Sequence, residues 1–100
     1  MRTIAAWQKA FKAAADRKFP GNASGAYDRV QSIQEQLDDV KTALRVERGE
    51  LKSDDHAHQD PNHRIGALLA DILILAEERG ADVESELEKV LAWFEGKSDN

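Results

Sequence analysis

The stretch from Asp60 to Leu91 limits the possible folds more than any other part of the chain. Asp60-Pro61 marks a helix start, because an aspartate can cap a helix and proline needs no acceptor at the first helical position. Gly80 marks the end of that helix, since glycine readily takes the left-handed conformation that closes one. Asp82 can cap a second helix. The pattern therefore predicts two consecutive helices that form a hairpin.

The first helix of this hairpin is apolar on two sides. Its main apolar face consists of Ile65, Leu68, Leu69, Ile72, Leu73, Leu75 and Ala76. A second, smaller apolar strip consists of Ala67, Ala70 and Ile74. A helix that is apolar on two sides is usually buried between layers or between partners. The return helix has one stripe, made of Val83, Leu87, Val90, Leu91 and Phe94. We therefore expect part of the burial to come from another protomer.

The rest of the chain predicts two more helices. Thr3 can cap a helix that ends near Lys18, before the breaker Phe19-Pro20-Gly21-Asn22. A longer helix runs from Ser24 or Gly25 to Arg48-Gly49, followed by a polar loop to Asp60 and, at the end of the chain, a frayed tail from Gly96. Four helices without a strand pattern predict an all-α bundle over residues 1–100, as a single domain.

The composition limits which binding partners and which cellular compartment we expect for this chain. A core built from 41% apolar residues in 100 is marginal, so we expect a homodimer or homotetramer. The net charge of −5 argues against nucleic acid and against an anionic membrane. The absence of cysteine excludes disulfides and thiolate sites. The N-terminus has no signal-peptide pattern and no apolar run is long enough to span a bilayer, so the expected location is the cytoplasm.

Acidic residues gather on the second predicted helix. Glu35, Asp38 and Asp39 are spaced so that Glu35 neighbours both aspartates on one helical surface. Carboxylates held in this way can bind Mg²⁺, which takes oxygen ligands and shares its shell with water and phosphates. The alternative is an ordinary solvated acidic face, because these residues lie roughly opposite the apolar stripe of the same helix. That stripe consists of Tyr27, Val30, Ile33, Leu37, Val40 and Leu44.

Asp71 stands out because it interrupts the apolar run of the third predicted helix, near Arg64 and Glu78. If its side chain is buried, it needs a metal or another partner. The alternative is a carboxylate at the helix edge that reaches solvent or pairs with an arginine. The histidines His56, His58 and His63 give a weaker metal hypothesis, since a loop pair is commonly just solvated.

Two blocks of the sequence resemble the all-α nucleoside triphosphate pyrophosphohydrolases of the MazG type. The first is Ile33-Gln34-Glu35-Gln36-Leu37-Asp38-Asp39-Val40, which resembles the family's Glu-Glu-x-x-Glu helix. The second runs from Arg64-Ile65-Gly66-Ala67-Leu68-Leu69 through Leu75-Ala76 and Gly80 to Asp82-Val83-Glu84. It resembles the family's Glu-x-x-Asp helix with its leucine-rich run and its restart. The resemblance covers roughly residues 30 to 94 and implies a four-helix MazG-like bundle that is oligomeric.

The resemblance also assigns roles to individual residues. Glu35 and Asp39 match the first and last acids of the first motif and are implied Mg²⁺ ligands, while Gln36 replaces the second glutamate. In the second motif Arg64 and Ala67 stand where the family has its glutamate and aspartate. Asp71, one turn beyond Ala67, is the candidate replacement ligand. Arg64 is the candidate for binding a substrate phosphate.

The implied activity is Mg²⁺-dependent cleavage of a nucleoside triphosphate, or a related nucleotide, to a monophosphate and pyrophosphate. The missing acids of the second motif favour an alternative, a catalytically degenerate bundle that binds a nucleotide or a protein partner without turnover. A third hypothesis is a structural helical oligomer whose polar loop, residues 49–60, contacts a partner.

Overall fold

The computed structural model describes residues 1–19, 26–50 and 60–96, and these ranges contain helices but no strand. The helices are α1 (Ile4–Lys18), α2 (Ala26–Glu47), α3 (Pro61–Glu78) and α4 (Val83–Phe94). The prediction of an all-α chain with four helices is confirmed. The predicted start of α2 at Ser24 or Gly25, the tail beyond Gly96, and most of the polar loop with His56 and His58 lie outside the described residues.

The predicted caps begin three of the helices. The side chains of Thr3, Asp60 and Asp82 accept hydrogen bonds from the backbone N–H groups of Ala6, Asn62 and Ser85 at 3.1, 2.9 and 3.1 Å. Each cap satisfies one of the backbone donors that have no partner inside the helix. Pro61 follows Asp60 at the start of α3, as the sequence predicted.

Gly80 closes α3 in the left-handed region, with a φ of +67°. The next N–H group, of Ala81, donates to the carbonyl oxygen of Ala76 at 2.8 Å, which satisfies one of the last carbonyls of the helix. Because this turn is defined by backbone hydrogen bonds and a cap at Asp82, it sets the direction in which α4 leaves α3.

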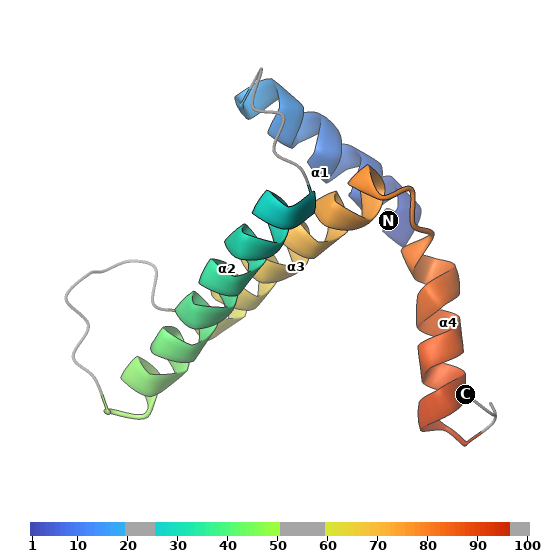
Figure 1. Ribbon diagram of the computed structural model, residues 1–100. Coiled ribbons are helices and arrows are strands. Elements are labelled where there is room, and N and C mark those ends of the chain that lie inside the picture. The colour runs from blue at the N-terminus through green and yellow to red at the C-terminus, as the bar shows by residue number, and fades with distance from the viewer. Residues whose placement is uncertain (20–25, 51–59, 97–100) are drawn as a thin grey trace.

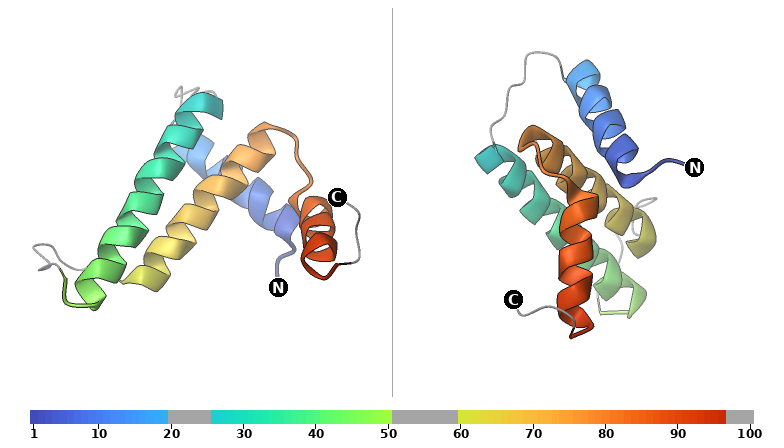
Figure 2. Two further views of the ribbon diagram at one scale, coloured as in Figure 1. Left: turned by 60° about the horizontal axis from the view of Figure 1, so that its bottom comes forward. Right: turned by 90° about the vertical axis from the view of Figure 1, so that its right-hand side faces the viewer.

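Helix α3 is the centre of the molecule. It lies antiparallel beside α2, and α1 crosses it near its C-terminal end (Figures 1 and 2). Gln8 fixes this crossing: its buried Nε2 donates to the carbonyl oxygen of Ala81 at 3.0 Å. Among the described residues, the buried hydrophobic core side chains lie on α2 and α3, and they are Val40, Ala43, Leu73, Ile74 and Ala76.

Helix α4 does not return along α3 as the predicted hairpin requires. It points away from the α2–α3 pair and makes a small contact with α1 (Figure 1). The radius of gyration is 16.0 Å, whereas a compact chain of this length has about 13 Å. No large side chain among the described residues is fully buried. A single chain therefore leaves its apolar layers partly uncovered.

Among the described residues, no helix combines the length and the apolar character that crossing a bilayer requires.

Candidate functional site

A row of polar side chains runs along the line where α2 faces α3. Ser32 Oγ donates to Asp71 Oδ2 at 2.9 Å, and seven residues further along α2, Asp39 Oδ2 lies 3.5 Å from Arg64 Nη1, seven residues back along α3. Equal steps in opposite directions define an antiparallel register without a slip. We call this row the seam, and its residues are Arg29, Ser32, Gln36, Asp39, Arg64, Asp71 and Glu78.

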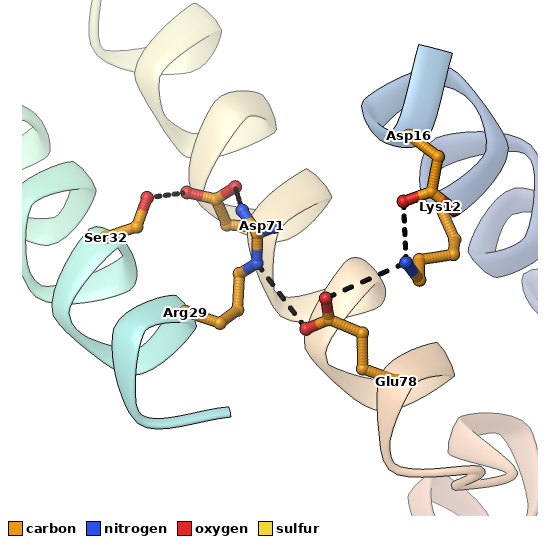
Figure 3. A network of polar contacts seen from close by, with 6 residues as sticks. All are labelled: Lys12, Asp16, Arg29, Ser32, Asp71 and Glu78. Atoms are coloured by element: carbon orange, nitrogen blue, oxygen red, sulfur yellow. Dashed lines mark hydrogen bonds and ion pairs between the residues drawn. The ribbon is translucent and has the colours of Figure 1, made fainter. Parts of the chain in front are cut away.

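Asp71 is the best-connected carboxylate of the seam. Only 13% of its side chain is exposed, and it accepts hydrogen bonds from Ser32 and, at 3.4 Å, from Arg29 Nη1 (Figure 3). Of the alternatives given for Asp71, the structure shows the ion pair with an arginine, and this arginine, Arg29, lies on α2. A carboxylate with two donors inside a helix pair is balanced without a metal ion.

The charges continue from Arg29 toward α1. Arg29 Nε lies 3.6 Å from Glu78 Oε1, and Lys12 Nζ lies 3.9 Å from the other oxygen of Glu78 and 2.7 Å from Asp16 (Figure 3). Basic and acidic groups alternate along this network, so its charges largely cancel. The Arg29–Glu78 contact is too long for a hydrogen bond, and the two facing atoms are buried without another partner among the described residues.

Asp39 and Arg64 are brought together at the other end of the seam. The side chain of Asp39 is 49% exposed and that of Arg64 is 25% exposed, so water reaches this pair. The structure therefore pairs Asp39 with Arg64, two residues that the sequence placed 25 positions apart. The arginine compensates the negative charge of Asp39.

Gln36 occupies the middle of the seam. Gln36 lies four residues after Ser32 on α2, and Ala67 lies four residues before Asp71 on α3. Because the two helices are antiparallel, the Ser32–Asp71 hydrogen bond sets a register in which Gln36 lies opposite Ala67. Its Oε1 atom is buried and has no hydrogen-bond partner among the described residues. A glutamine and an alanine therefore face each other across the middle of the seam, and neither side chain carries a charge.

Glu35 lies beside the seam on the exposed surface of α2, as does Asp38. Within residues 1–19, 26–50 and 60–96, the structure gives Glu35 no hydrogen bond or ion pair. The same ranges contain no group of three or more histidine, aspartate or glutamate side chains that could hold a metal ion. A single chain therefore does not gather Glu35, Asp39 and Asp71 around one point, and His63 is an exposed residue at the start of α3.

A polar recess of about 430 Å³ opens beside the part of the seam nearest α1. We call this part, with Arg29, Ser32, Asp71 and Glu78, the inner seam, and the part with Asp39 and Arg64 the outer seam. The recess is bounded by α1, α2 and α3, and its charged and polar lining residues are Asp16, Asp28, Arg29, Ser32 and Glu78. Three of these are acidic and one is basic, so the recess is a poor match for a phosphate by charge alone.

Arg29 and Ser32 were not among the predicted site residues, although both belong to the seam. A signal was present, because positions 29, 32, 36 and 39 follow the alternating steps of three and four that place residues on one helical face. All four are polar, and they flank the apolar stripe of α2. Only the register with α3 shows that this polar row faces inward.

Comparison of the chain with protein-family models, with curated proteins and with solved structures finds no match.

Proposed function

We propose that this chain is a MazG-like helical subunit that binds a nucleotide at the α2–α3 seam without turning it over. The observation that carries the proposal is the pairing of Asp39 with Arg64 and of Asp71 with Arg29. A Mg²⁺ site needs carboxylates whose charge is not already balanced. Here Asp39 faces Arg64, and Asp71 faces Arg29, so neither carboxylate is left with an unbalanced charge that would draw a metal ion.

Arg64 is the residue we expect to contact the nucleotide. Its guanidinium is partly exposed, and its 3.5 Å contact with Asp39 is longer than a strong charge-assisted hydrogen bond. A phosphate can compete for this guanidinium because a planar fork of donors matches phosphate oxygens. Such a ligand, drawn from the nucleotide pool, is consistent with the expected cytoplasmic location.

The residues of one chain do not fit the implied Mg²⁺ ion. Glu35 is exposed, Asp39 faces Arg64, and Asp71 already accepts two hydrogen bonds. These three side chains of one chain therefore do not form a Mg²⁺ site.

The test of nucleotide binding is a thermal-shift titration with ribo- and deoxynucleoside tri-, di- and monophosphates. Binding to the native state raises the melting temperature. We expect a shift that Arg64→Ala removes. Arg48→Ala, which changes an exposed arginine outside the seam, should keep it. A melting temperature that no nucleotide raises would retire the proposal.

The second candidate is the Mg²⁺-dependent pyrophosphohydrolase itself. The observation in its favour is that Glu35, Asp39 and Asp71 all remain on the two helices that form the seam. Incubation of the nucleotide panel with Mg²⁺ or Mn²⁺, followed by a pyrophosphate assay, separates the two candidates. Binding without product supports the first, whereas pyrophosphate release that Glu35→Ala abolishes supports the second.

A further inference from the structure

Outside the seam, the clearest candidate for a binding surface is the exposed apolar face of α4. This helix has no buried residue, and its Leu91, Trp93 and Phe94 are 56%, 54% and 73% exposed. A helix of 12 residues is marginal in water by itself and normally depends on packing of its apolar face. Such a face in a small protein marks an interaction surface.

An apolar groove lies next to this helix. It has a volume of about 330 Å³ and is lined on α1 by Ile4, Trp7 and Phe11, and on α3 by Leu69 and Leu73. Val83 and Leu87 of α4 form its remaining wall, so the first half of α4 borders the groove and the second half extends past it. The chain therefore has an apolar ridge and an apolar recess side by side.

We propose that a second copy of this chain places its α4 in this groove, while the α4 of the first chain enters the groove of the second. The two chains would then be related by a twofold axis, and we call this arrangement the exchange of α4. In a twofold dimer the same patch is used on both chains and must be complementary to itself. A ridge and a groove on one chain meet this requirement, because each chain fills the groove of the other. This inference rests on apolar exposure and stands apart from the nucleotide proposal.

The exposed apolar area is sufficient for a dimer. Trp93 and Phe94, at roughly 200 Å² each, leave about 250 Å² exposed between them. Leu87, Val90 and Leu91 of α4, with Trp7 and Leu69 of the groove, raise this to roughly 700 Å² per chain, close to the ~800 Å² per partner of a stable interface.

The charges on the two surfaces are also complementary. Helix α1 carries four basic residues against one acid, whereas α4 carries three glutamates against one lysine. Two of the four, Lys9 and Lys12, already pair with acids of the same chain, which leaves Arg17 and Lys18 to attract a partner. At the edge of the groove, the guanidinium carbon of Arg2 lies 4.8 Å from the centre of the Trp7 ring. A partner's α4 along α1 would bring its glutamates, Glu84 and Glu88 among them, toward this basic helix.

The mass of the chain in solution tests the proposal. Light scattering on a sizing column should give twice the 11.1 kDa chain mass for the wild type. The double variant Leu91→Asp/Phe94→Asp should elute at the single-chain mass, with its helical circular dichroism retained. Leu37→Asp on α2 is the matched control, since Leu37 is 55% exposed and Leu91 is 56% exposed, and it should remain a dimer.

Three outcomes would overturn the proposal. A wild type that stays at the single-chain mass would leave the α4 face for a different protein. A dimer that survives the α4 substitutions would place the interface elsewhere. Dissociation by Leu37→Asp alone would place it on the open side of α2.

If the charged variants do not fold, disulfide crosslinking between two chains tests the proposed dimer instead. The chain has no cysteine, so two single-cysteine variants, Leu69→Cys in the groove and Leu91→Cys on α4, can be mixed and oxidised. A size tag on one variant identifies the mixed product. We expect the Leu69→Cys and Leu91→Cys pair to give more crosslinked product than a control pair of Leu37→Cys and Leu91→Cys. If the control pair gives as much product or more, the exchange of α4 is contradicted.

Discussion

The seam and the groove of this protein lie on the same central helix but differ in what a single chain provides for them. At the seam, the acids of one helix meet arginines or a hydroxyl from the other, and the charges largely cancel. At the groove, apolar side chains of α1, α3 and α4 border an open space. The polar groups of the chain thus find most of their partners within it, whereas part of its apolar surface does not.

This difference follows from the physics of the two kinds of group. A polar group that is buried without a partner costs free energy, so it must be paired inside the chain before it can be covered. Apolar surface needs only to be removed from water, and a second chain can do this as well as the first. A small chain can therefore leave the burial of its apolar surface to an oligomer.

The largest effect should come from Leu73→Ala, which removes a buried side chain from the groove wall. We expect the free energy of unfolding to fall by about 3 kcal/mol, because a buried leucine loses both its transfer energy and its packing. Urea denaturation at one fixed chain concentration measures it. Leu37→Ala, at a half-exposed position, should cost about 1 kcal/mol. Equal losses would mean that the groove wall is no part of the core.

Asp71→Ala should have the next largest effect and probes the inner seam. It leaves the Arg29 guanidinium and the Ser32 hydroxyl without their acceptor, and we expect a loss of about 2 kcal/mol. Asp38→Ala, at an exposed position on α2, should change the free energy of unfolding by less than about 0.5 kcal/mol. If both variants unfold at the same urea concentration, the inner seam contributes nothing to stability.

Gly80→Ala probes the turn that directs α4 away from the seam. An added Cβ would meet no atom within 4 Å, so the whole effect comes from the left-handed backbone at φ +67°. We expect a loss of about 1 kcal/mol in urea denaturation. Gly80→Asn should lose less, because asparagine tolerates this conformation. An alanine variant as stable as the wild type would contradict the left-handed turn.

Asp39→Ala should have the smallest effect and sharpens the contrast within the seam. Because water reaches the Asp39–Arg64 pair, its loss should cost under about 1 kcal/mol, and the cost should shrink as salt is added. The measurement is urea denaturation at low and high ionic strength. A cost as large as that of Asp71→Ala would show that the outer seam is as well sheltered as the inner one.

Much of the secondary structure followed from local chemistry. The caps at Thr3, Asp60 and Asp82 and the glycine stop at Gly80 all act within a few residues of their own position. Such signals are legible in a sequence because the hydrogen bonds that they make are local. Asp71 was also correctly expected to need a partner if buried, since an acid inside an apolar run is costly without one.

The partners of the site residues were harder to predict. Sequence spacing placed Asp71 near Arg64 on its own helix, but the arginine that pairs with it, Arg29, is 42 residues away along the chain. The motif resemblance gave Glu35 and Asp39 a common role, yet Asp39 faces Arg64 while Glu35 faces solvent. The metal and nucleotide roles of these residues, and the oligomeric state, stay predictions.

The sequence by itself determined that the chain forms helices, where three of them start, and which of their faces are apolar. Helix periodicity and capping are properties of neighbouring residues, so they need no knowledge of the fold. Only the tertiary structure decided which faces meet. The register of α2 against α3 paired each seam acid with an arginine, and the turn after α3 carried α4 away from the core. Both depend on packing between residues distant in the chain, which no local pattern specifies.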